Sequence, residues 1–84
     1  FPNPFNPTTH IQVTLPQRSP VSVHIYDTLG QAVRTLVDGE RDAGIYLLTW
    51  DGRNDGGDLV ASSSYLYRLD TPGLRLTRTM TLVR

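Results

Sequence analysis

Apolar and polar residues alternate along several short segments of this chain, and turn residues separate these segments at intervals of about ten residues. In the segment 9–15, for example, Ile11, Val13 and Leu15 would share one face of a strand, because successive side chains point to opposite faces. Residues that favour helices are scarce, since the chain has three Ala, one Glu and no Lys. The pattern predicts an all-β fold, an antiparallel sandwich of six or seven strands.

Six segments are expected to be strands, and a seventh short edge segment is expected at 59–61; the six are 9–15, 21–26, 31–37, 44–50, 64–70 and 74–83. Val33, Leu36 and Val37 break strict alternation, which a β-bulge or a single helical turn would explain. Turns are expected at 27–30, 38–43 and 71–73, with Gly30 at a positive φ. Trp50 is expected to anchor the core, where it would bury on the order of 200 Å².

Composition excludes several kinds of site. The chain has no Cys, so it has neither a disulfide nor a thiolate metal centre. All eight basic residues are Arg, which excludes a lysine Schiff base, a P-loop lysine and a Lys–Asn isopeptide bond. A net charge of zero argues against a nucleic-acid partner held by broad electrostatics. No apolar run approaches about 18 residues, so no transmembrane segment is expected.

The segment 51–58 is acidic and rich in glycine, which suggests two readings. The alternating carboxylates of Asp51, Asp55 and Asp58 resemble the start of a calcium loop. The third position is the cation Arg53, however, and the twelfth is Ser62 in place of a bidentate Glu. We therefore expect a strand connection whose Asp and Asn side chains bond the local backbone, with a weak calcium site left open. No metal or other cofactor is expected.

Candidate catalytic groups are few. His10 and His24 fall on the polar faces of the first two strands, where ordinary surface histidines are expected. If those strands were neighbours, the two would form a thin acid–base or metal trio with Asp27. Residues 62–64 are three serines without a nucleophile elbow or an adjacent base. An enzyme is not expected. Five aromatic residues would form either core or a sugar-stacking platform, and four of them alternate as core positions do; the five are Tyr26, Tyr46, Trp50, Tyr65 and Tyr67.

Charge is distributed unevenly along the chain. Residues 38–58 hold six acidic side chains, whereas residues 68–84 hold four Arg and a single acidic residue, Asp70. A basic last strand could dock an acidic partner groove by edge pairing. Arginines on an edge strand also prevent aggregation, so this alternative stays open.

Several motifs occur in an order that points to a known family. They are residues 2–9 (PNPFNPTT), 26–30 (YDTLG), 43–46 (AGIY), 50–52 (WDG) and 65–69 (YLYRL), followed by a basic, apolar terminal strand. The chain resembles the type A C-terminal sorting domain of the type IX secretion system, and it is similar to the related Ig-like domain of flagellar hook-capping proteins. The resemblance covers nearly all 84 residues. It implies an Ig-like or fibronectin-III-like sandwich.

The resemblance also implies a function, that of a sorting tag at the end of a larger cargo protein. Such cargo, secreted to the cell surface in Bacteroidetes and related phyla, crosses the periplasm and then the outer membrane. The implied partners are the type IX translocon, a surface sortase-like protease and a fused upstream cargo domain. By position, the implied recognition residues are Gly44, Tyr46, Arg78, Met80, Leu82 and Arg84. Two departures are Arg in place of the family's Lys on the last strand, and Ser63 in place of a turn glycine.

We therefore expect a monomeric, non-catalytic sorting module. Residues 1–8 are expected to be a linker from the upstream cargo and residues 9–84 the sandwich, because the chain begins at Phe1 with a proline-rich run. Two alternatives are a carbohydrate-binding or adhesive module and a structural Ig-like spacer, which includes the flagellar relative.

Overall fold

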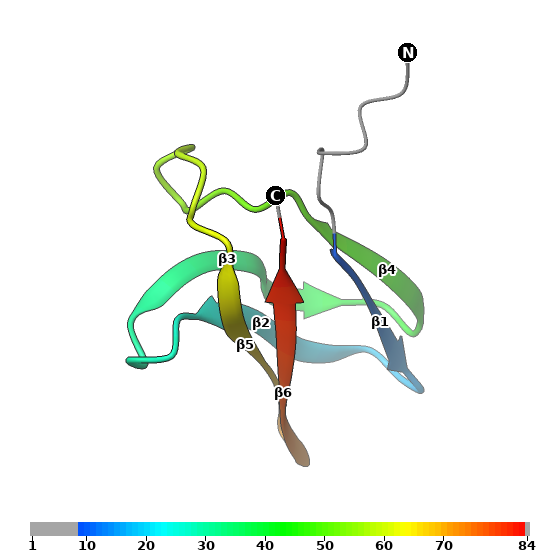
Figure 1. The fold of residues 1–84 in the computed structure, drawn as a ribbon. Helices are drawn as coiled ribbons and strands as arrows, with labels where there is room; N and C mark the ends of the chain where they lie inside the picture. Colours follow the sequence, from blue (N-terminus) through cyan, green and yellow to red (C-terminus); the bar gives the residue numbers. More distant parts are fainter. Residues whose placement is uncertain (1–8, 84) are drawn as a thin grey trace.

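A computed structural model describes residues 9–83, while residues 1–8 and Arg84 lie outside the described part (Figure 1). The expected all-β sandwich is confirmed, with six antiparallel strands: β1 (Thr9–Leu15), β2 (Ser19–Tyr26), β3 (Ala32–Arg41), β4 (Gly44–Trp50), β5 (Ser63–Thr71) and β6 (Leu74–Leu82). Between residues 9 and 83 there is no helix long and apolar enough to cross a membrane. The predicted linker 1–8 falls on residues that are not described.

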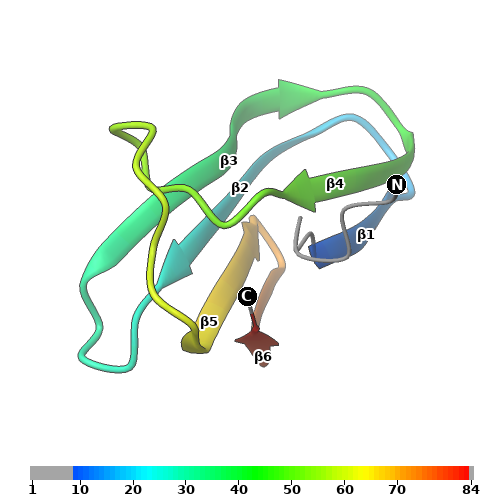
Figure 2. The same cartoon turned by 45° about the horizontal axis from the view of Figure 1, so that its top comes forward.

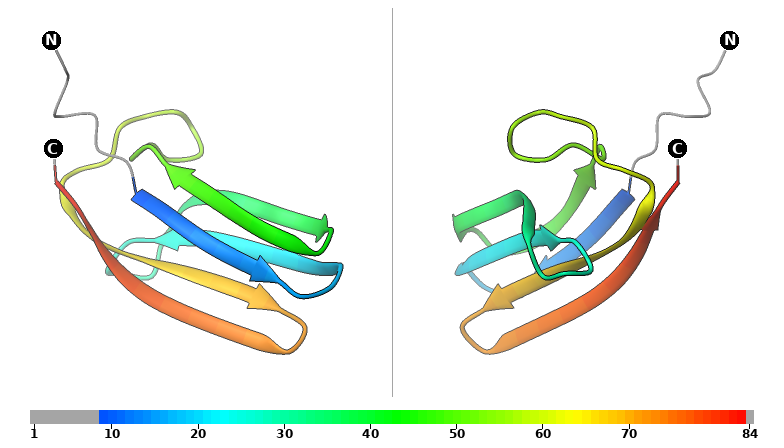
Figure 3. Two further views of the ribbon diagram at one scale, coloured as in Figure 1. Left: turned by 90° about the vertical axis from the view of Figure 1, so that its right-hand side faces the viewer. Right: turned by 60° about the vertical axis from the view of Figure 1, so that its left-hand side comes forward.

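The strands form two sheets that face each other as layers (Figure 3). The smaller sheet pairs β1 with β4, and the larger has the order β3-β2-β5-β6. Figure 2 shows β4 near β3 on one side of the sandwich, and the free edges of β1 and β6 together on the other side. Four strands are thus covered by two, which leaves part of the larger sheet without a facing strand.

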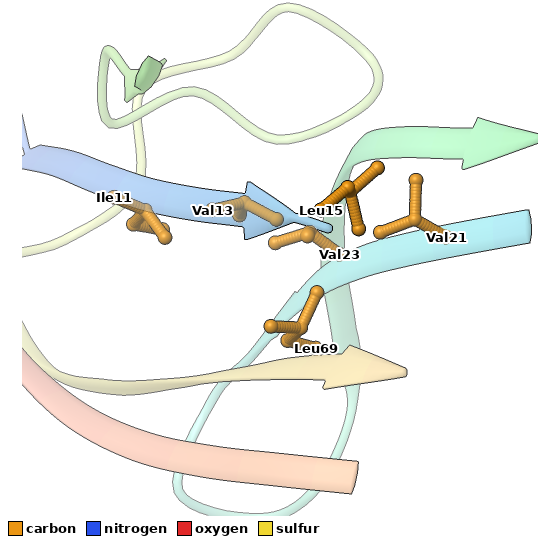
Figure 4. Packing of buried hydrophobic residues seen from close by; sticks show 6 residues of the cluster. All are labelled: Ile11, Val13, Leu15, Val21, Val23 and Leu69. Carbon is orange, nitrogen blue, oxygen red and sulfur yellow. The ribbon is translucent and has the colours of Figure 1, made fainter. Parts of the chain in front are cut away.

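Two groups of buried side chains fill the space between the sheets. Figure 4 shows the first group, in which side chains of β1 point onto β2 and β5; it comprises Ile11, Val13, Leu15, Val21, Val23 and Leu69. The second group lies around Trp50 and includes Ile25, Tyr65 and Leu82. Trp50 is fully buried, which confirms its predicted place in the core. Half-buried Leu36 and Tyr67 contact both groups and join them into one core.

The expected turn at 27–30 is confirmed in detail. Gly30 has φ +82°, and its N–H donates to the Asp27 carbonyl at 3.0 Å. The Asp27 carboxylate accepts the N–H groups of Leu29 and Gln31, each at 2.9 Å. Asp27 therefore fixes the turn by bonding the backbone locally, as short polar side chains do in turns.

The strand β3 is longer than expected. The turn predicted at 38–43 is wrong, because pairing with β2 continues as far as Ser19 opposite Arg41. Gly39, at φ +142°, lets the chain continue through an irregular conformation there. The register shifts after Val23 and after Ile25, which supports the predicted bulge over a helical turn. At 59–61 there is no strand, and a single bridge joins Arg53 to Leu59.

Candidate interaction site

The outer face of the four-stranded sheet carries a row of charged contacts centred on Asp70. Arg75 Nε donates to Asp70 Oδ1 at 2.7 Å, and Arg68 Nε lies 3.2 Å from Asp70 Oδ2 as an ion pair without hydrogen-bond alignment. Arg68 Nη2 donates to the Tyr26 hydroxyl at 3.1 Å, and its guanidinium carbon lies 5.2 Å from the ring centroid. Together these side chains form a polar surface on strands β2, β5 and β6.

The charges of this row shift the pKa of two of its members. The pKa of Asp70 is held below its ordinary value of 3.8, and the main cause is the hydrogen bond from Arg75. The positive charges of Arg75 and Arg68 lower this pKa further, whereas desolvation of the carboxylate raises it. The same hydrogen bond raises the pKa of Arg75 further above its ordinary value. Both groups are therefore charged at neutral pH.

We predict that Asp70→Asn lowers the melting temperature at pH 7 and has little effect in acid. Because the folded state lowers the pKa of Asp70, its contribution to stability is complete above the unfolded value of 3.8 and is lost as the pH falls through the lowered pKa. Thermal melts of both proteins between pH 7 and about pH 2 check this, and the two melting curves should converge at the acid end. If the difference in melting temperature between the two proteins stays constant across this pH range, the charge of the Asp70 carboxylate does not contribute to stability.

Two of the residues expected to recognise a partner, Gly44 and Tyr46, lie at the start of β4. The Tyr46 hydroxyl donates to the Asp42 carbonyl at 2.7 Å, and the ring packs against the core. Gly44 has φ +153°, a conformation that side chains rarely adopt. In this structure both residues shape the turn between β3 and β4, and their role in recognition stays a prediction.

The other expected recognition residues lie on β6, and they differ in exposure. Leu82 is 2% exposed and packs beside Trp50, while Met80 is half-buried against the same group. Arg78 is exposed and stands opposite Tyr67 in the register, so it shares the core-facing side of the sheet. Arg84 lies outside the described residues. Arg78 is therefore the residue of this group best placed to meet a partner.

The acidic loop 51–58 is built around a cation, Arg34 of β3. Arg34 Nη1 lies 3.3 Å from Asp51 Oδ1 and donates to the Arg53 carbonyl at 3.2 Å, and Arg34 Nε lies 3.9 Å from Asp55 Oδ1. The Asn54 amide oxygen accepts the N–H of Asp58 at 3.0 Å. The loop has the local side-chain-to-backbone bonds expected of a strand connection. Within residues 9–83 no three His, Cys, Asp or Glu side chains are grouped closely enough to hold a metal ion.

Asp55 covers the free edge of β3, which the sequence did not predict. Its N–H donates to the Val33 carbonyl at 2.9 Å, and its carboxylate accepts the Thr35 N–H at 3.0 Å. An edge strand with unpaired backbone groups is prone to pair with other chains, so this contact protects the part of β3 around Val33 and Thr35. The only available signal was the loop's carboxylates, which did not show which strand they would reach.

We predict that Asp55→Ala destabilises the fold by about 1 kcal/mol, because the Thr35 N–H loses its acceptor. Amide exchange at Thr35 should become faster, and this can be followed by residue-resolved hydrogen exchange. Asp55→Asn is the matched control, since its side-chain oxygen can still accept the bond. Equal exchange rates at Thr35 in Asp55→Ala and Asp55→Asn would contradict the role of Asp55 as acceptor of the Thr35 N–H.

The trio of His10, His24 and Asp27, which depended on the first two strands being neighbours, is not assembled. β1 and β2 belong to different sheets, so the two histidines are not neighbours. His10 Nδ1 lies 3.2 Å from Thr49 Oγ1, and His24 Nδ1 lies 2.9 Å from Thr35 Oγ1. The Asp27 carboxylate is engaged in its own turn. Of the five aromatic residues, Tyr26 alone lies on the outer face, which leaves no row of rings for a sugar platform.

Comparison with known proteins identifies the family. The sequence-family model of the FlgD Ig-like domain matches residues 4–71 of this chain. The chain belongs to the FlgD Ig-like domain family. It is 42% identical over 59 residues to the basal-body rod modification protein FlgD of Salmonella typhimurium, and equally to that of Salmonella typhi. This match covers 69% of the chain and 25% of each relative, so the chain spans about a quarter of their length.

Structural comparison agrees with this family. The crystal structure of FlgD from P. aeruginosa is similar, with a TM-score of 0.66 and 26% identity; the match covers 90% of this chain and 59% of that one. This module is therefore similar to FlgD in both fold and sequence.

These findings correct the expected function. The two curated relatives are named for basal-body rod modification, and the family model and the solved structure described above are also those of FlgD. The assignments of a sorting tag, of type IX and sortase partners, and of delivery to the cell surface are therefore wrong. The alternative of a structural Ig-like module, which included the flagellar relative, agrees better with the findings.

Proposed function

We propose that this FlgD-type Ig-like domain is a non-catalytic structural module of a larger protein that acts at the flagellar basal-body rod. The observation that carries the proposal is the match of residues 4–71 to the FlgD Ig-like domain, together with 42% identity to FlgD proteins named for rod modification. The fold supports it, since one continuous core joins both sheets into a rigid unit.

The side chains that could have supported chemistry have structural roles instead. Asp27 fixes a turn, Asp51 contacts Arg34, and Asp55 covers an edge of the sheet. A base, an acid and a nucleophile do not converge among these groups, which is what catalysis would require. The module therefore contributes shape and surface to the larger protein.

A domain exchange in Salmonella typhimurium tests the proposal. The segment of its FlgD that matches this chain is replaced by residues 1–84, and the chimaera is expressed in a strain lacking FlgD. We expect swimming in soft agar and hooks visible by electron microscopy. An in-frame deletion of the segment should give neither.

Two controls make the result interpretable. Immunoblots establish that the chimaera and the deletion accumulate equally, and a chimaera carrying an unrelated β-sandwich of similar length separates length from surface. A chimaera that accumulates normally and yet builds no hooks would contradict the proposed function. Restoration by the unrelated sandwich would show that the module acts as a spacer.

A further inference from the structure

One side of the sandwich is open between β1 and β6. On the opposite side, β3 is covered by Asp55 of the loop 51–58. Among the described residues, β1 pairs with β4 alone, so the backbone groups along its other edge have no partner strand. In Figure 2 this edge and the free edge of β6 flank the same side of the molecule. One position for a strand beside β1 is therefore vacant.

The surface below this vacant position is apolar. On the core-facing row of β6, Leu74 is 53% exposed, and Leu76 and Met80 are half-buried although they face the interior. A hollow of about 330 Å³ lies where β1 ends and β6 begins, and Leu15 and Leu69 are among the residues that line it. Side chains on the inner face of a sheet normally pack against a second layer, and here that layer is incomplete.

Arg78 places a positive charge beside this vacant position. It lies on the same core-facing row, and the structure shows no ion pair for it with any residue between 9 and 83. Arg68 and Arg75, by contrast, are both paired with Asp70. An unpaired cation on an otherwise apolar row is complementary to a single carboxylate flanked by apolar residues.

We infer that the open side binds an extended segment of a partner protein, which adds a third strand to the β1–β4 sheet and places an acidic residue against Arg78. Backbone hydrogen bonds to β1 would supply the affinity, and alternate side chains would pack onto β6. The chain's own residues 1–8 are poor candidates for this strand. In a strand, every second N–H points towards the same neighbouring strand. Proline has no N–H, and Pro2 and Pro4 interrupt the even-numbered set while Pro7 interrupts the odd-numbered set, so neither set could form a continuous row of hydrogen bonds to β1.

This inference goes beyond the proposed function, because it concerns a binding surface of the module and not its place at the basal-body rod. Failure of the domain exchange would leave it standing, and failure of the binding test below would leave the structural role standing.

The probe is a synthetic nine-residue peptide in which Thr and Val alternate and one inward Val is replaced by Glu. The matched peptide carries Lys at that position. Binding to the full chain is followed by amide chemical shifts and hydrogen exchange, at peptide concentrations up to about 1 mM. We expect the Glu peptide to bind and to protect the β1 amides that point away from β4, and the Lys peptide to bind about tenfold more weakly.

Charge reversal supplies the variants. Arg78→Glu should weaken the Glu peptide about tenfold and strengthen the Lys peptide, which a nonspecific loss of folding would not do. Arg41→Glu makes the same change of charge at an exposed position on β3, at the opposite edge of the four-stranded sheet, and should leave both affinities within about twofold. Thermal melts establish that each variant is folded.

Three results of the peptide-binding test would overturn the inference. The first is no binding of the Glu peptide, and the second is equal binding of both peptides. The third is protection at β4 or at the outer edge of β6 instead of β1. Deletion of residues 1–8 is a further arm: unchanged affinity supports a partner strand, whereas a large gain would assign the vacant position to those residues and overturn the inference.

Discussion

Trp50→Ala should be the most destabilising aromatic truncation in this domain, with a loss of about 3–5 kcal/mol in the free energy of unfolding. The side chain is fully buried, and its ring meets Tyr65 edge-on with centroids 5.1 Å apart. Its Nε1–H donates to the Arg53 carbonyl at 2.9 Å, so the indole also anchors the start of the acidic loop. Small domains are stable by only ~5–15 kcal/mol, and the loss is therefore a large share of the total.

Urea and thermal unfolding measure this loss, and the melting temperature should fall by roughly 12 °C or more. Trp50→Phe is the control, since it keeps an aromatic ring and loses volume and the hydrogen bond; it should cost about 1–2 kcal/mol. Leu29→Ala, at a side chain that is 83% exposed, should change little. A melting temperature that barely moves in Trp50→Ala would place the indole on the surface.

Leu82→Ala should cost about 2–5 kcal/mol, whereas Arg78→Ala, four residues earlier on the same strand, should stay within about 0.5 kcal/mol. Leu82 is 2% exposed within the group around Trp50, and truncation would leave a cavity there. Arg78 is exposed, and no ion pair of it is found within the described residues.

Denaturant unfolding of the two variants checks this contrast, and Leu82→Met keeps most of the volume as a matched control with a loss below about 1.5 kcal/mol. The contrast separates a core residue from a surface residue on one strand. Similar losses in both alanine variants would show that β6 packs differently from the structure.

The strands and the core could be read largely from the sequence, because their signal is local. Alternation predicted that Ile11, Val13 and Leu15 face inward, and all three are buried. The acid and glycine of the turn at 27–30 also act locally, which is why Asp27 and Gly30 behave as expected. Because successive side chains of a strand point to opposite faces, the sequence of one strand is enough to predict which of its side chains share a face.

The arrangement of the strands into sheets could not be predicted in the same way. Alternation carries no information about which strand lies beside which, and so it could not decide whether His10 and His24 would meet; their strands lie in different sheets. The contact of Asp55 with β3 joins residues 20 positions apart and depends on the path of the loop. The exposure of Arg78 follows from the missing third strand in the opposite layer, which the sequence of β6 does not reveal.

The family motifs explain why the resemblance predicted the fold correctly and the function wrongly. The motif at 26–30 builds a turn, Tyr46 closes another by its bond to Asp42, and Tyr65 is buried in the core. Positions of this kind determine how a sandwich folds, and related domains with different functions share them. They do not distinguish a sorting domain from a FlgD Ig-like domain, and the comparison of the whole sequence with FlgD proteins was needed for that.

Asp55 covers the edge of β3 at Val33 and Thr35, whereas the edge of β1 that points away from β4 is open among the described residues. Native-state hydrogen exchange, resolved by residue on the full chain, tests it most directly. We expect slow exchange at Thr35, comparable to the paired amides of β2, and fast exchange at the β1 amides that point away from β4. Fast exchange at Thr35 together with slow exchange along that edge of β1 would contradict it.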